Sequence, residues 1–167
     1  MNMAFYISGV IAVLATFMAI TRREAIHGLV YLVVSLLAAA VAFLVLGAPF
    51  AAALEVITYA GAMMVMLLFV MMTLTPKTRN RGGDMSNINP WSWLGPALMT
   101  LLLAGDFVYI IMSGTAFPAS GIDVSPRQVG QVLFGPYVLG VELASMLLLA
   151  GLVGAYHLGH QDSRKRG

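Results

Sequence analysis

Five long apolar stretches fill most of this 167-residue chain. They run over Met3–Thr21, Ile26–Leu46, Phe50–Leu74, Trp91–Met112 and Val132–Leu158. A bilayer core about 30 Å thick needs roughly 20 apolar residues in a helix that crosses it. Each stretch meets this length. We therefore predict an all-α polytopic membrane protein with five transmembrane helices.

The composition agrees with a membrane-embedded chain. Hydrophobic residues make up 60% of the sequence and charged residues 10%, whereas about a quarter of the residues of a soluble domain are charged. The segments between the stretches are too short to form a core of their own, so we expect residues 1–167 to form a single transmembrane bundle. The sequence has no cysteine, which excludes cysteine-ligated iron–sulfur clusters and disulfides. Any electron transfer must then occur in another chain.

Basic residues gather on one side of the predicted bundle. Eight of them follow the first helix, follow the third helix or lie in the C-terminal tail: Arg22, Arg23, Lys77, Arg79, Arg81, Arg164, Lys165 and Arg166. Only Arg127 lies on the opposite side. By the positive-inside rule, the N-terminus is outside and the C-terminus is cytoplasmic, as five spans require.

The segments between the helices carry turn residues. Gly47-Ala48-Pro49 predicts a tight outer turn that joins the second and third helices into a hairpin. Thr78–Asn89 is expected to be a polar cytoplasmic loop, and Ser113–Gln128 an outer loop in which Pro118, Gly121 and Pro126 are turn residues. Trp91 and Trp93 suit a membrane interface.

Small residues recur at four-residue spacing in three of the helices. The rows are Ser8, Ala12 and Thr16; Ser35, Ala38, Ala39 and Ala42; and Gly140, Ala144, Gly151 and Ala155. Such rows let helices approach closely in lipid. They can serve packing inside the bundle or contact with other subunits.

Three acidic residues lie within the predicted spans, at Glu55, Asp106 and Glu142. Lipid makes such groups costly, which marks them as candidates for function. All three are expected in the outer half of the membrane, with no basic residue at their depth. They could be neutral acids bonded to Tyr59, Ser145 or the backbone. They could instead meet a cation of another subunit, or relay protons.

The third helix has a weak point at Ala60-Gly61-Ala62, because glycine lowers helix propensity by about 1 kcal/mol relative to alanine. It can mark close packing or a local π-bulge. Tyr59 follows Glu55 by four residues, on the same helix face. No metal site is predicted: His157 and His160 have no evident third ligand, and we interpret them and His27 as interfacial.

Three segments resemble one known family. His27–Leu37 (HGLVYLVVSLL), Leu54–Val65 (LEVITYAGAMMV) and Leu133–Gly151 (LFGPYVLGVELASMLLLAG) resemble the second, third and last helices of the subunit J family of bacterial respiratory complex I. The mitochondrial counterpart of that family is subunit 6. The similarity covers nearly the whole chain in order.

The resemblance implies a core membrane subunit of a proton-pumping NADH:quinone oxidoreductase in the bacterial inner membrane. It implies a π-bulge near Tyr59, Ala60, Gly61 and Val65, whose opening and closing gates a water path. Glu55, Glu142 and Asp106 are our candidates for polar lining or a proton path. Asp106 is not part of the family pattern. The chain itself would have no catalytic centre, and NADH, flavin, iron–sulfur clusters and quinone would bind partner subunits.

Membrane subunits A, H, K and N are the implied partners, and we expect no nucleic-acid partner. A subunit of a multisubunit cation/proton antiporter is the alternative function, since chains of that class resemble this one. A purely structural scaffold is the third possibility. We expect the presence or absence of flavin and iron–sulfur subunits in the purified assembly to separate the first two.

Overall fold

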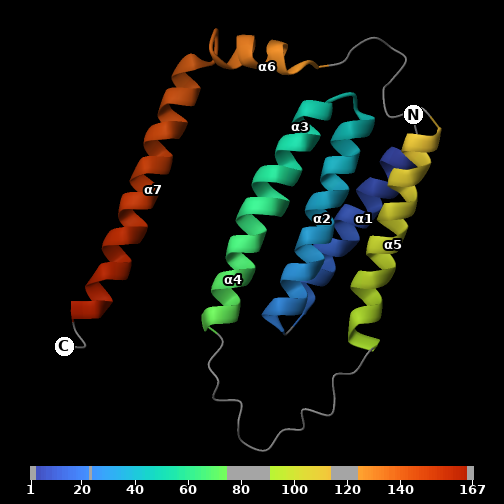
Figure 1. Ribbon diagram of the computed structural model, residues 1–167, viewed down its shortest axis with the longest axis horizontal. Coiled ribbons are helices and arrows are strands. Elements are labelled where there is room, and N and C mark those ends of the chain that lie inside the picture. The colour runs from blue at the N-terminus through green and yellow to red at the C-terminus, as the bar shows by residue number, and fades with distance from the viewer. Residues whose placement is uncertain (1–2, 23, 75–90, 114–123, 165–167) are drawn as a thin grey trace, which may run out of the picture. The chain divides into compact units, whose positions relative to one another are not determined.

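The computed structural model describes residues 3–22, 24–74, 91–113 and 124–164, and every element in these ranges is a helix (Figure 1). Five helices are long and apolar enough to cross a membrane: Met3–Thr21, Ala25–Val45, Pro49–Leu74, Trp93–Met112 and Val138–Gly159. The predicted all-helical architecture with five spans is thus confirmed. The loop Thr78–Asn89 and most of the Lys and Arg residues behind the predicted orientation lie outside the described residues.

The chain divides into two compact units, Met1–Val124 and Ser125–Gly167. The helices of the first are α1 (Met3–Thr21), α2 (Ala25–Val45), α3 (Pro49–Leu54), the π-helix η1 (Glu55–Met63), α4 (Met64–Leu74) and α5 (Trp91–Met112). The second contains α6 (Pro126–Leu133) and α7 (Val138–Arg164).

In the first unit, α2 contacts every other helix. Its longest interface is with α1, and α5 packs against both. The buried core where these three helices meet contains Ala4, Ile11, Ala15, Val34, Ala38, Val41, Leu103 and Ile110. Alanine at the α1–α2 contact brings the two backbones close, as expected for helices that associate in lipid. The small-residue rows of these two helices therefore serve packing inside the unit.

A polar cluster joins α1 and α2 within this apolar contact. The Ser35 hydroxyl donates to the Ala12 carbonyl at 3.0 Å, and the Thr16 and Ser35 hydroxyl oxygens lie 2.7 Å apart. Thr16 also bonds the Ala12 carbonyl at 2.9 Å. Each hydroxyl finds a partner without water, which membrane burial demands.

The turn between α2 and α3 has the predicted form. Gly47 adopts a positive φ of 81°, a conformation open to glycine at little cost. Its N–H bonds the Leu44 carbonyl at 3.1 Å, and Pro49 occupies the first turn of α3. The second and third spans therefore form a hairpin.

The second unit differs from the expectation at its start. Residues 132–158 were predicted as one helix, but α7 begins at Val138, after a separate helix α6 over Pro126–Leu133. α6 begins at a capping box: the Gln128 N–H bonds the Ser125 hydroxyl oxygen at 3.4 Å, and the Ser125 N–H bonds the Gln128 side chain at 3.2 Å. This pairing fixes a helix start within the segment predicted as loop.

Candidate functional site: the π-helix of the third span

The third span, Pro49–Leu74, changes its helical form midway. Nine residues, Glu55–Met63, are π-helical, with α-helix before and after them. At its end the Met64 N–H bonds the Tyr59 carbonyl, five residues back instead of four. π-helices are rare and often mark functional sites, which makes η1 the leading candidate site among the described residues.

The residues of η1 explain why an α-helix is not strongly preferred there. Val56, Ile57 and Thr58 are consecutive β-branched residues, which crowd the preceding turn of an α-helix. Gly61 follows, and glycine has low helix propensity. A Cβ atom at position 61 would stand 3.0 Å from the Val56 carbonyl oxygen, so the absence of a side chain suits the wide turn.

The predicted hinge residues divide between two elements. Tyr59, Ala60 and Gly61 lie within η1, whereas Val65 lies just beyond it in α4. Ala60 and Met64 are buried, in a segment that packs on α2. Gly61 and Val65 are exposed in this chain, and Tyr59 is half exposed. One side of the π-helix is thus fixed to α2 and the other is open to lipid or a neighbouring chain.

Glu55 begins η1 and is half-buried. Within the described structure its carboxyl has no hydrogen bond to the Tyr59 hydroxyl. The Thr58 hydroxyl donates to the Leu54 carbonyl, so it is engaged with the backbone. The Glu55 carboxyl and the Tyr59 hydroxyl therefore remain available to water or to a partner chain.

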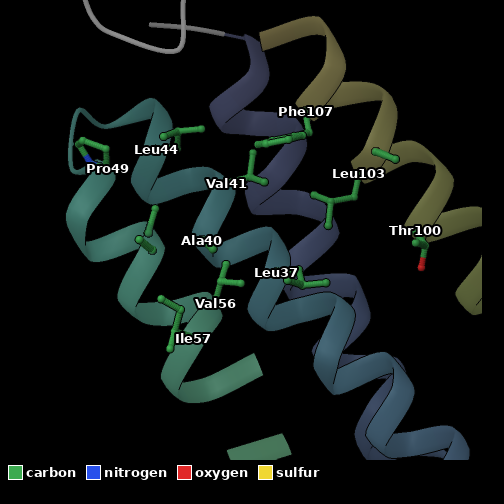
Figure 2. A pocket seen from close by; sticks show the side chains of 13 residues that line it. Leu37, Ala40, Val41, Leu44, Pro49, Val56, Ile57, Thr100, Leu103 and Phe107 are labelled. Atoms are coloured by element: carbon green, nitrogen blue, oxygen red, sulfur yellow. The ribbon is translucent and has the colours of Figure 1, made fainter. Parts of the chain in front are cut away.

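An apolar cavity of about 600 Å³ lies between α2, the α3–η1 segment and α5 (Figure 2). On the η1 side this space is lined by Val56 and Ile57, and on the α5 side by Leu103 and Phe107. Among the lining residues only Thr100 has a hydroxyl group, and it donates to the Pro96 carbonyl at 2.8 Å. An apolar lining of this kind offers water almost no hydrogen-bond partners, so this space is unsuited to a water path.

Asp106 is the most buried of the three acids, with 7% of its surface exposed. It lies on the α5 stripe between Leu103 and Ile110, both members of the core shared with α1 and α2. Its Oδ2 atom is inaccessible and has no hydrogen-bond partner among the residues that the structure describes. Burying a carboxyl without a hydrogen-bond partner costs free energy. The packing of α5 does not by itself explain why an acid lies at position 106.

Glu142 lies in the second compact unit, on α7, and is exposed there. A hydrogen bond from Ser145 to its carboxyl was one of the open alternatives, and the described residues do not form it. The Ser145 hydroxyl donates instead to the main-chain carbonyl of Glu142 at 2.7 Å. Because α7 begins at Val138, Glu142 is four residues into the helix, about 6 Å from its start.

A second cluster, the Tyr31 cluster of Arg22, Tyr31 and Gly95, joins the end of α1 to the first turns of α2 and α5. The Arg22 guanidinium donates to the Tyr31 hydroxyl at 3.1 Å and lies 5.2 Å from the ring centre. Tyr31 is almost fully buried. A Cβ at Gly95 would stand 2.0 Å from the tyrosine hydroxyl oxygen. The sequence analysis missed this cluster; Gly95, early in an apolar helix, was the available signal.

His27, near the start of α2, contacts two other side chains. His27 pairs with Glu24 at 2.9 Å and its ring lies 5.1 Å from that of Trp93. The described residues contain no group of three potential metal ligands. The side chain of His160 lies outside the described structure.

Comparison with known proteins identifies the family of this chain. Residues 15–158 match the model of the family described as NADH-ubiquinone/plastoquinone oxidoreductase chain 6. The chain belongs to this family. The NADH-quinone oxidoreductase subunit J of Escherichia coli is 47% identical over 97% of this chain and 88% of its own length. That of Pseudomonas aeruginosa is 45% identical over 99% of this chain and 100% of its own.

A more divergent relative has the same extent. The NADH-quinone oxidoreductase subunit J of Buchnera aphidicola from Acyrthosiphon pisum is 40% identical over 98% of this chain and 96% of its own. As a chain 6 family member with five apolar spans, the protein is a multi-pass subunit of NADH-quinone oxidoreductase in the bacterial inner membrane. This outcome favours the first of the functions that the sequence left open.

Proposed function

We propose that this chain couples quinone reduction on neighbouring subunits to proton translocation, through a change in the winding of η1. The observation that carries the proposal is the nine-residue π-helix in the middle of the third span. The chain takes no part in redox chemistry in this account. NADH, flavin, iron–sulfur clusters and quinone bind partner subunits.

The winding of η1 can have two states of similar energy. A helix in lipid must satisfy its N–H groups internally, and both π and α ladders do so. β-branched residues and Gly61 lower the preference for the α form. If the wide turn loses one residue and becomes α-helical, the part of the helix on one side of it rotates by about 100° and shifts by about 1.5 Å relative to the other side. Such a step re-aims the polar side chains near it.

The surfaces of η1 support this mechanism. Ala60 is buried and the segment packs on α2, whereas Tyr59 and Gly61 are exposed in the isolated chain. A change of winding would therefore move Tyr59 and Glu55 relative to a fixed α2. Bistable elements of this kind turn a small displacement into a switch. The charge distribution supports an N-terminus outside and a cytoplasmic C-terminus, and subunits A, H, K and N are the expected neighbours.

The proposed polar lining gives the test of this function. Glu142→Gln keeps the size of the side chain but removes its capacity to carry a proton. We expect NADH-driven proton pumping in membrane vesicles to fall several-fold, while the complex assembles with its flavin and iron–sulfur subunits. Unchanged pumping would leave Glu142 with a structural role only.

Ser145→Ala is the matched control. Its hydroxyl bonds the main-chain carbonyl of Glu142 and not the carboxyl, so the substitution leaves the acid intact. Pumping by this variant should equal that of the wild type. Purification of either protein without flavin and iron–sulfur subunits would instead favour the antiporter assignment.

A further inference from the structure

α6 has two distinct faces. On a helical projection of 3.6 residues per turn, its apolar residues Pro126, Val129, Val132 and Leu133 occupy one arc. Arg127, Gln128 and Gln131 occupy the opposite arc. Val132 and Leu133 are 47% and 40% exposed, so the packing of α6 against α7 leaves much of the apolar face uncovered. An amphipathic helix with an open apolar face needs a partner.

α6 and α7 are joined by a bend that backbone hydrogen bonds stabilise. The Phe134 N–H bonds the Gly130 carbonyl at 2.9 Å, and the Tyr137 N–H bonds the Val132 carbonyl at 3.2 Å. A Cβ at Gly135 would stand 2.6 Å from the backbone oxygen of Gln131, so this close turn requires glycine. α6 consequently runs across the end of α7 and does not continue its axis (Figure 1).

The direction of α7 fixes the environment of α6. Val138–Gly159 is long and apolar enough to cross the bilayer. A helix that crosses the end of such a span lies along the membrane surface. Phe134 and Tyr137, at the bend, are 75% and 63% exposed, and aromatic residues concentrate at the lipid–water interface. The apolar face of α6 thus adjoins the exposed aromatic residues at the bend.

We propose that α6 is an interfacial helix that binds the phospholipid surface where α7 enters the membrane. Its apolar face contacts the upper acyl chains, as in other amphipathic helices at membrane surfaces. Arg127, on the polar arc, reaches lipid phosphate, for which a guanidinium is well suited. α6 thereby fixes the depth of α7, and with it the depth of Glu142.

Quenching experiments on the assembled complex in phospholipid nanodiscs test this placement. A small fluorescent amino acid is introduced singly at Val129 or Leu133, and at Gln128 or Gln131 as matched polar-face controls. We expect lipid-borne doxyl groups to quench the first pair and aqueous iodide to quench the second. Iodide quenching at all four positions, or protection of Val129 and Leu133 from both quenchers by a protein partner, would overturn the proposal.

A second measurement uses the wild-type complex and does not depend on folding of variants. Phospholipid with a photoreactive group near the top of its acyl chain is incorporated into the nanodiscs, and adducts are mapped by mass spectrometry. We expect adducts within Val129–Leu133 as well as at the start of α7. Adducts confined to α7 would contradict the interfacial position of α6.

Discussion

Replacing Gly61 by leucine is expected to abolish most proton pumping and quinone reductase activity while the complex still assembles. Leucine exceeds glycine in helix propensity by close to 1 kcal/mol, and a bias of this size changes a two-state population about fivefold. A Cβ at position 61 also meets the Val56 carbonyl oxygen at 3.0 Å, which opposes the wide turn. Both effects favour the α form of η1.

The measurement is NADH-driven proton uptake and NADH:quinone reductase rate in inverted membrane vesicles, normalised to the amount of assembled complex. Gly61→Ala should give an intermediate loss, since its methyl group needs only a small shift of the carbonyl. Gly9→Leu is the matched control, because a Cβ at Gly9 in α1 meets nothing within 4 Å. Full rates and full pumping in assembled Gly61→Leu would contradict the role of η1.

Gly95→Ala is expected to destabilise the first unit by about 1–3 kcal/mol, as overpacking of a filled site does. The added Cβ would stand 2.0 Å from the hydroxyl oxygen of Tyr31, which is 1% exposed. Relief would require the ring to move away from Arg22. The temperature at which the purified complex loses this chain should fall accordingly.

Tyr31→Phe provides the decisive partner variant. Alone it removes one hydrogen bond from Arg22 and should cost about 1 kcal/mol. Combined with Gly95→Ala it also removes the clashing oxygen, and the nearest ring carbon is 3.2 Å from the added Cβ. The double variant should therefore be more stable than the sum of the single effects predicts. Additive losses would show that the clash is absent, and Gly105→Ala, with open space around its Cβ, should cause no loss of stability.

The spans and the hairpin could be predicted from the sequence because lipid leaves few choices. Length and hydropathy locate a span, and Gly47 and Pro49 have specific backbone roles in the turn that joins two of them. The predicted helix ends of α2 and of the third span lie within one residue of those observed. These features depend on local chemistry and on the bilayer, which are both available from the residues.

The predicted start of the last helix at Val132 was wrong for a local reason. Ser125 and Gln128 form a capping box that begins a separate helix, α6. Gly135 and Pro136 then interrupt the apolar stretch, and α7 begins only at Val138. Both signals are present in the sequence, but hydropathy alone does not reveal them.

The candidate site was predictable in place but not in form. The weak point at Gly61 could be located from propensity, but propensity alone favoured close packing over a π-helix, and only the family resemblance implied the π form. The burial of Asp106 depends on the packing of α5 against α1 and α2, and no local sequence pattern predicts that packing. The partners of Glu55 and Glu142 depend on neighbouring chains, whose surfaces this sequence does not contain.

The most direct test of the coupling account is the hydrogen-bond ladder of η1 in the intact complex, traced by electron cryomicroscopy at rest and during turnover. We predict two populations. In one, the Met64 N–H bonds the Tyr59 carbonyl, as in the present structure; in the other, it bonds the Ala60 carbonyl four residues back. The same π ladder in every particle class during turnover would contradict the account.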